Sequence, residues 1–166
     1  MILTGSEIVR LRKKGEITIE PFCESMVNPN SYNYRLGELL KLPNPSEDGF
    51  IDFIIPQDGF VMTPHTLYLG HTYEKLGSTT HSMSLIGRSS IGRLGLFLQV
   101  SANLGHTGSC HCWTLELVAT RPIRIYPKMR IGQISYWENV GLSEPYTGGY
   151  SKYDFAQESK MEQKPS

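Results

Sequence analysis

Two clusters in this sequence have residue types and spacing suited to chemistry. The first runs from Gly87 to Gly95 and combines two arginines and two serines with glycines. Guanidiniums, hydroxyls and backbone amides bind anionic oxygens, so this cluster could hold phosphate or a polar ring. The second is Glu116, a lone acid inside the apolar run from Trp113 to Val118. A carboxylate there could accept a proton from water, so the two clusters indicate hydrolytic chemistry on a charged small molecule.

Each cluster also has a purely structural interpretation. In a strand, Glu116 shares one face with Thr114 and Val118, while Trp113, Leu115 and Leu117 face the other way. The acid could then be an ordinary surface residue on a half-exposed strand, and the pattern alone favours neither interpretation. The serines and arginines of the first cluster could likewise be a solvated turn.

The three cysteines indicate neither a disulfide framework nor a zinc site. Cys110, His111 and Cys112 are adjacent and His106 is near, but the separated ligand pairs of structural zinc sites are missing. In a strand, Cys110 and Cys112 share one face and His111 points to the other. We therefore expect packed thiols beside a partly exposed imidazole, and no protein-held metal.

Composition limits the partners. Sixteen basic and sixteen acidic residues cancel, so no overall field attracts nucleic acid or an anionic membrane. The first seven residues lack the apolar region of a signal peptide, and no run approaches the roughly 20 apolar residues of a membrane helix. With 166 residues, the chain is expected to be one cytoplasmic domain that binds neither nucleic acid nor membrane.

One short helix and many short strands are expected to position these clusters. Ser6 as N-cap and Gly15 as stop bracket the helix. Apolar runs between turn residues then predict an all-β sandwich or barrel, with strands over residues 17–19, 32–36, 50–55, 60–62, 66–72, 82–86, 97–101, 113–119, 123–125 and 131–137. The polar C-terminus is either a frayed end or a flexible lid.

Several segments resemble the dCTP deaminase branch of the dUTPase-like superfamily. They are the Gly-Arg-Ser-Ser-x-x-Arg-Leu-Gly run at 87–95, Thr-Leu-Glu at 114–116, residues 30–37, residues 127–133 and the Ser-Lys-Tyr at 151–153. The resemblance implies a dUTPase-like distorted β-barrel or jelly roll with a short N-terminal helix. Residues 1–150 would be the catalytic domain and residues 151–166 a flexible nucleotide-covering tail. It also implies a homotrimer with active sites at subunit interfaces.

The resemblance assigns roles to individual residues. Glu116 matches the general base and acid, while Ser89 and Arg93 match the residues that bind the attacking water and orient the carboxylate. Nucleotide binding falls to Arg88, Ser90, Ser101, Ala102, His106, Thr114, Leu115, Tyr146, Lys152 and Gln157. Deamination would be independent of zinc, because the His-x-Glu and Pro-Cys-x-x-Cys signature of zinc deaminases is missing from the sequence. Mg²⁺ would be bound through the nucleotide phosphates.

The expected reaction is hydrolysis of dCTP to dUTP and ammonia. The main alternative is a dUTP diphosphatase, or a bifunctional enzyme that makes dUMP directly. Two further alternatives are a related nucleotide-binding protein without catalysis and an unrelated carbohydrate- or nucleic-acid-binding sandwich.

One segment departs from the family pattern. Leu104 stands where an arginine is common, and His106 stands where family members have an aspartate that accepts from the sugar 3′-hydroxyl. Histidine accepts through a neutral nitrogen or carries charge, so the sugar or phosphate end could be read differently here.

Overall fold

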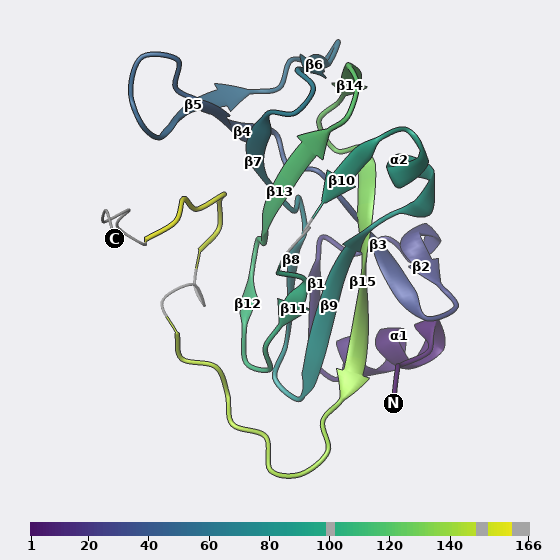
Figure 1. The fold of residues 1–166 in the computed structure, drawn as a ribbon. Helices are drawn as coiled ribbons and strands as arrows, with labels where there is room; N and C mark the ends of the chain where they lie inside the picture. Colours follow the sequence, from purple (N-terminus) through teal and green to yellow (C-terminus); the bar gives the residue numbers. More distant parts are fainter. Residues whose placement is uncertain (99–101, 149–152, 161–166) are drawn as a thin grey trace.

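Short apolar runs pair into antiparallel sheets around one core (Figure 1). The computed structural model describes residues 1–98, 102–148 and 153–160. The first sheet has the order β10 (Leu96–Leu98), β13 (Thr114–Ala119), β7 (Leu67–His71), β4 (Leu39–Pro43) and β5 (Phe50–Ile54). The second has the order β11 (Leu104–Gly105), β9 (His81–Gly87), β15 (Arg130–Glu138), β3 (Ser31–Arg35) and β2 (Val27–Asn28).

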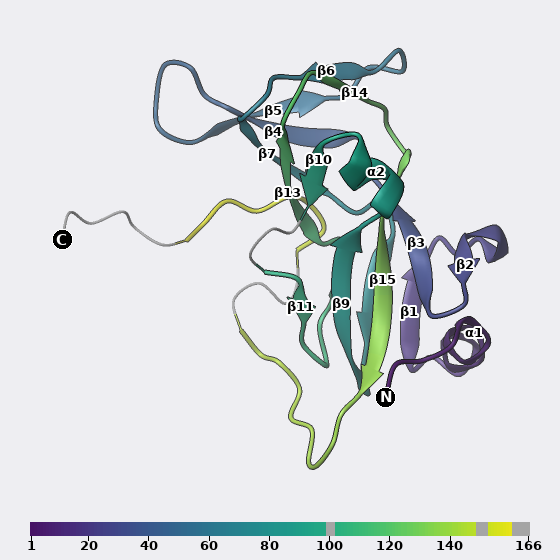
Figure 2. The ribbon, with the colours of Figure 1, turned by 45° about the vertical axis from the view of Figure 1, so that its right-hand side comes forward.

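Two smaller sheets complete the strands of the described residues. One has the order β1 (Ile17–Glu20), β8 (Lys75–Ser78) and β12 (Cys110–His111), and the other pairs β14 (Ile123–Ile125) with β6 (Phe60–Met62). The helices are α1 (Gly5–Lys13) and α2 (Ser89–Arg93), with a 3₁₀ turn η1 at Glu24–Met26. The predicted all-β class with a short N-terminal helix is confirmed (Figure 2).

The two large sheets share one apolar core. Leu115 and Leu117 of the first sheet and Tyr34 and Tyr136 of the second are fully buried in it. The Tyr34 ring lies so close to Gly132 on the neighbouring β15 that a Cβ there would stand 2.0 Å from the ring carbon Cζ. Only glycine therefore fits at position 132.

The N-terminal helix forms as expected except at its start. Thr4, and not Ser6, is the N-cap, since its Oγ1 accepts a hydrogen bond from the Glu7 amide at 3.4 Å. Ile8 and Leu11 bury one face of the helix, and Gly15 ends it with φ +77°.

Other elements differ from the sequence-based expectation. The strands β4 and β8 were not predicted, because their sequences, Leu-Leu-Lys-Leu-Pro and Lys-Leu-Gly-Ser, lack the β-branched residues typical of strands. The Ser89–Arg93 segment is a short helix, whereas the structural alternative for this cluster was a solvated turn. Within the described ranges, no helix combines the length and apolarity needed to cross a lipid bilayer.

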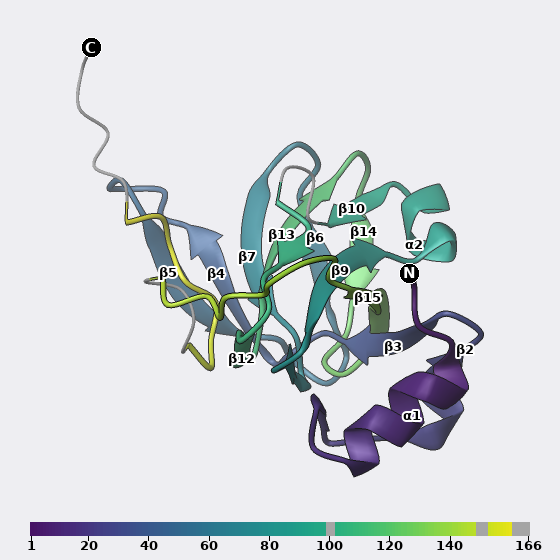
Figure 3. The ribbon, with the colours of Figure 1, turned by 90° about the horizontal axis from the view of Figure 1, so that it is seen from below.

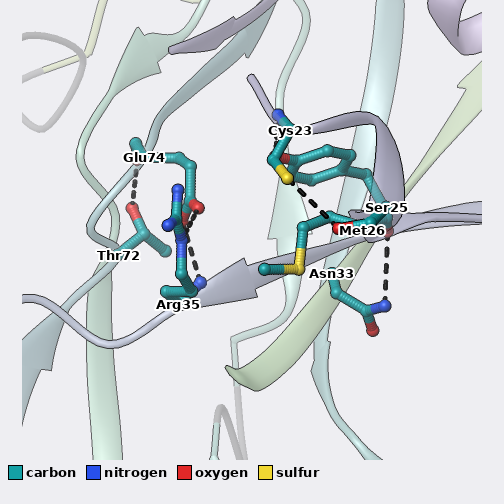
Figure 4. Close-up of polar contacts among 8 residues, drawn as sticks. Cys23, Ser25, Met26, Asn33, Arg35, Thr72 and Glu74 are labelled. Carbon is teal, nitrogen blue, oxygen red and sulfur yellow. Dashed lines mark hydrogen bonds and ion pairs between the residues drawn. The ribbon is translucent and has the colours of Figure 1, made fainter. Parts of the chain in front are cut away.

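A buried ion pair joins the second sheet to the connection between β7 and β8 (Figure 4). The Arg35 guanidinium Nε donates to Glu74 Oε1 at 2.6 Å, and the Arg35 amide donates to Oε2 at 2.8 Å. The Glu74 side chain has no exposed surface. Thr72 Oγ1 donates to the Glu74 carbonyl at 2.7 Å and accepts from the Trp113 amide at 2.9 Å. The pair therefore fixes the strand ends that lead into β13.

Replacing Arg35 should destabilise the fold strongly. Arg35→Ala leaves the Glu74 carboxylate buried without its cation, so the free energy of unfolding should fall by about 3 kcal/mol in urea denaturation. The matched control is Lys128→Ala, which breaks a half-exposed pair with Glu38 and should cost under about 1 kcal/mol. Equal losses in the two variants would contradict this account.

Candidate active site

Strand β13 presents Glu116 on the face of the first sheet that points away from the core. Leu115 and Leu117 are buried, whereas Thr114, Glu116 and Val118 are half-buried. This alternation is the one predicted from the sequence, and it is confirmed. We call this face of the first sheet the outer face.

Cross-strand pairing defines the neighbours of Glu116 on the outer face. Thr114 lies opposite His71 of β7, and Glu116 lies opposite Leu69. Leu69 in turn lies opposite Lys41 of β4. Residues directly opposite each other in antiparallel strands project to the same side, so the acid stands among a threonine, an imidazole and an ammonium.

The C-terminal segment of residues 153–160, called here the tail segment, lies on the outer face (Figure 3). The Gln157 amide donates to Thr114 Oγ1 at 2.9 Å, which brings together two residues assigned to nucleotide binding. The Phe155 ring meets His71 edge-on, with centroids 5.7 Å apart. Ala156 is 1% exposed, although it and Leu69 lie outside the main core. The tail segment therefore has its own small contact area beside Glu116.

An ion-pair network fastens the end of the tail segment. Lys41 Nζ donates to Glu158 Oε1 at 3.1 Å and to Asp52 Oδ1 of β5 at 2.9 Å. These hydrogen bonds, that to Asp52 most, raise the pKa of Lys41, so the ammonium stays charged near neutral pH. Lys41 thus links the sheet edge to the tail.

The arginine and serine cluster occupies α2. Arg88 is the N-cap residue, and Ser89, Ser90 and Arg93 are exposed on the helix. In Figures 1 and 3, β13 and β10 lie between α2 and the tail segment. The helix and the tail therefore flank the sheet from opposite sides.

His106 and Tyr146 form a second contact between predicted site residues. Their rings stack with centroids 5.0 Å apart at 25°, and the Tyr146 amide donates to the Thr107 carbonyl at 2.8 Å. They line a hollow of about 540 Å³ together with the exposed Leu104. Ala102 is exposed just before β11. Ser101 and Lys152 lie outside the described residues.

The thiol and imidazole cluster differs from expectation. His111 is buried, and its ring contacts that of Trp113 with centroids 4.2 Å apart and a tilt of 32°, so the prediction of a partly exposed imidazole was wrong. Cys110 and Cys112 are half-buried free thiols, and burial raises the pKa of Cys112 to about 11. Among the described residues, no group of three or more His, Cys, Asp or Glu side chains is placed to hold a metal ion.

Sequence reasoning missed three residues of the outer face: His71, Lys41 and Phe155. His71 stands in a predicted strand, but only the pairing of β7 with β13 brings it beside Thr114. The alternation in Leu39–Pro43 could have pointed to an outward Lys41, had that strand been predicted. Phe155 is a large apolar residue in a mostly polar tail, which was a usable signal for docking.

Comparisons with known proteins agree on one family. Residues 2–139 match the family model described as dCTP deaminase-like. The chain is 44% identical over 155 residues to the "dCTP deaminase, dUMP-forming" of Hathewaya histolytica, covering 90% of each chain. It is 45% identical over 160 residues to the protein of that name from Clostridium botulinum, covering 90% of this chain and 89% of the relative. It is 46% identical over 151 residues to the "dCTP deaminase" of Rhodopirellula baltica, covering 86% of this chain and 75% of the relative.

A solved structure shares the fold. The crystal structure of 2′-deoxycytidine 5′-triphosphate deaminase from Agrobacterium tumefaciens superposes with a TM-score of 0.68 at 23% identity. The match covers 83% of this chain and 48% of that one, so this chain aligns with about half of its length. The dUTPase-like β fold expected from the sequence is confirmed, and with the match over residues 2–139 the chain belongs to the dCTP deaminase-like family.

Proposed function

We propose that this chain hydrolyses dCTP to dUMP, releasing ammonia and pyrophosphate. The observation that carries the proposal is the position of Glu116, on the outer face two residues from Thr114, beneath a tail that bonds Thr114 through Gln157. Residues 1–150 form the catalytic domain in this proposal, and residues 151–166 cover the nucleotide.

Glu116 is the proposed proton carrier for deamination. It takes a proton from water, whose oxygen adds to C4 of the cytosine ring. Glu116 passes this proton to ring nitrogen N3, where it stays. It then moves the remaining proton of the new C4 hydroxyl to the amine, and the C4–N bond breaks to give uracil and ammonia. Ser89 positions the water, and the Arg93 guanidinium, which cannot titrate near neutral pH, orients the carboxylate.

The names of the relatives favour dUMP over dUTP as the final product. The Hathewaya and Clostridium relatives carry the description "dUMP-forming", whereas the Rhodopirellula relative is described as a dCTP deaminase without that addition. In the dUMP-forming reaction a second water attacks the α-phosphate and pyrophosphate leaves. We therefore propose the bifunctional alternative in place of simple deamination to dUTP.

The phosphates are proposed to bind Arg88 and Ser90 at the start of α2, with Lys152 and Gln157 from the tail. Backbone around Ser101, Ala102, Thr114 and Leu115 would read the base. Mg²⁺ would accompany the triphosphate, since phosphate oxygens are its preferred ligands and the ion lowers their mutual repulsion.

The complete site is proposed to form between copies of the chain in a homotrimer. The exposed residues of α2 and the Glu116 face lie on different sides of β10 in one chain. Leu94 after α2 and Phe97 of β10 are 47% and 46% exposed, so they offer apolar surface that a second copy could cover. A second copy that covered them would bring its own α2 or outer face into the site.

Changing the proposed proton carrier should abolish turnover and leave binding intact. We expect Glu116→Gln to lower kcat for dCTP by about 10²- to 10⁴-fold, with the dissociation constant of dCTP little changed. Ammonia, pyrophosphate and dUMP are assayed together, and equal amounts of the three are expected for the unaltered chain. The matched control is Glu47→Gln, the same change at an exposed loop position.

Three outcomes would contradict the proposed reaction. Near-normal turnover by Glu116→Gln would remove the carboxylate from the mechanism. Tight dCTP binding by the unaltered chain, with no product, would identify a nucleotide-binding protein without catalysis. Accumulation of dUTP without pyrophosphate would return the reaction to simple deamination.

Complementation tests whether the site is shared between subunits. Glu116→Gln and Arg93→Ala chains are each expected to be inactive, and co-expression with two different affinity tags yields mixed trimers. If each site takes Glu116 and Arg93 from neighbouring chains, random mixing restores about a quarter of wild-type activity. Background activity in the mixed trimers would place both residues in one chain.

The substitution of His106 should alter the phosphate preference. His106→Asp places a carboxylate where a ring able to carry positive charge now stacks on Tyr146. We expect kcat/KM for dCTP relative to dCMP to fall by about 3- to 10-fold, the worth of one hydrogen bond. CTP is measured in parallel, and His106→Phe, which keeps the ring stack, is the control. An unchanged preference in His106→Asp would show that position 106 does not read the nucleotide.

A further inference from the structure

A cavity of about 520 Å³ lies on the outer face, on the far side of Thr114 from Glu116. Its floor includes residues of β4, β5 and β7, and Asp154 and Phe155 of the tail segment form one side of it. The residues that bear on its chemistry are Leu39, Ile54, His71, Tyr73, Cys112 and Phe155. The Gln157 amide bonded to Thr114 stands between this cavity and Glu116. The cavity is therefore a compartment of its own.

His71 offers this cavity one hydrogen-bond acceptor. Its Nδ1 lies 2.9 Å from the Thr72 carbonyl, so Nδ1 carries the proton and Nε2 is left with a lone pair. Within the described residues, Nε2 has no hydrogen-bond partner. His71 is only 8% exposed. Burial lowers the pKa of its imidazole, which keeps the ring neutral at neutral pH.

The orientation of the His71 ring is fixed by its neighbours. Gly37 lies so close that a Cβ there would be 2.1 Å from the ring carbon Cε1 and 2.2 Å from Nε2, so only a glycine leaves space beside the acceptor. On the other side the Phe155 ring meets it edge-on at 79°. A neutral acceptor held in one orientation beside the cavity can accept one hydrogen bond from a ligand.

The charges around the cavity disfavour anions. None of the described residues that line it is lysine or arginine, and two of them, Glu38 and Asp154, are acids. Arg35 and Lys128 lie over the Tyr73 ring, but each is paired with an acid, Arg35 with Glu74 at 2.6 Å and Lys128 with Glu38 at 2.8 Å. The walls are leucine, isoleucine and aromatic rings. A phosphate group does not suit these surroundings, whereas a flat uncharged ring does.

We propose that this cavity is a second ligand site, for an uncharged heteroaromatic ring that donates an N–H to His71 Nε2. The ring packs between Tyr73 and Phe155 and against Leu39 and Ile54. Because Phe155 and Asp154 of the tail form one wall, the ligand binds the docked tail better than the free one. By linkage, it also holds the tail on the outer face beside Glu116.

Binding of benzimidazole tests the proposal. Isothermal titration at pH 7.5 should show saturable binding to the full chain, and 1-methylbenzimidazole, which lacks the N–H, should bind at least about 10-fold more weakly. His71→Phe should weaken benzimidazole binding by a similar factor. Phe155→Ala, a change at a 58% exposed position that should not disturb folding, should also weaken it.

The matched control is His111→Phe. His111 is also buried and also has Nδ1 against the next carbonyl, at 3.0 Å, but it packs on Trp113 away from the cavity. Benzimidazole binding should be unchanged in this variant. Equal binding of the two probes, unchanged binding in both His71→Phe and Phe155→Ala, or no binding at millimolar probe would overturn the proposal.

A competition experiment separates this site from the nucleotide site. Saturating dCTP, added to the Glu116→Gln chain so that it is not consumed, should leave benzimidazole bound. Displacement by dCTP would make the cavity part of the nucleotide site and end the claim of a second one. The result does not depend on turnover, so the failure of the proposed reaction and the failure of this proposal are distinguishable.

Discussion

The pairing of β13 with β7 is the constraint on which the rest of the site depends. It places Leu115 and Leu117 in the core and leaves Thr114 and Glu116 outside. A slip of one residue would bury the carboxylate without a partner and expose two leucines, each worth roughly 2 kcal/mol of burial. Gly70, opposite Leu115, leaves room for the core leucines to pack closely, since a Cβ there would lie 3.1 Å from Cδ1 of both Leu117 and Leu36. Core packing therefore decides which residues face the ligand.

The tail segment is held by contacts of a different kind. It uses one backbone hydrogen bond to Thr114, an edge-on ring contact to His71 and an ion pair to Lys41. Each is worth at most about 1 kcal/mol at a half-exposed surface, far less than the barrel core. Contacts this weak would let the segment open and close locally while the barrel stays folded, as the proposed cover over the nucleotide requires. In the proposed function, the barrel supplies the geometry and the tail supplies the reversible closure.

Features set by local periodicity could be predicted from the sequence. The alternation in Thr114–Ala119 placed Glu116 correctly relative to its own strand, and Gly15 correctly ended the first helix. Strand pairing could not be predicted in the same way. Nothing in the Leu67–His71 run says that His71 will lie opposite Thr114, because that depends on which strands become neighbours. Likewise, the burial of His111 depends on its ring contact with Trp113 and on strand β12 joining β8.

The same distinction applies to the motif that identified the family. The motif of Ser89 and Arg93, with Glu116 some twenty residues later, suggests that the three side chains act together. In the folded chain, however, Ser89 and Arg93 lie on an exposed helix and Glu116 lies on a sheet face. The exposed Phe97 lies opposite Val118, which lies opposite Leu67, so an apolar row runs along the outer face beside the acid. Water over that row would raise the effective dielectric around Glu116 and weaken any guanidinium that orients it. In the proposed trimer, a neighbouring copy seated on the row removes that water and brings its own Arg93 beside Glu116. Apolar burial and catalytic electrostatics thus favour the same assembly.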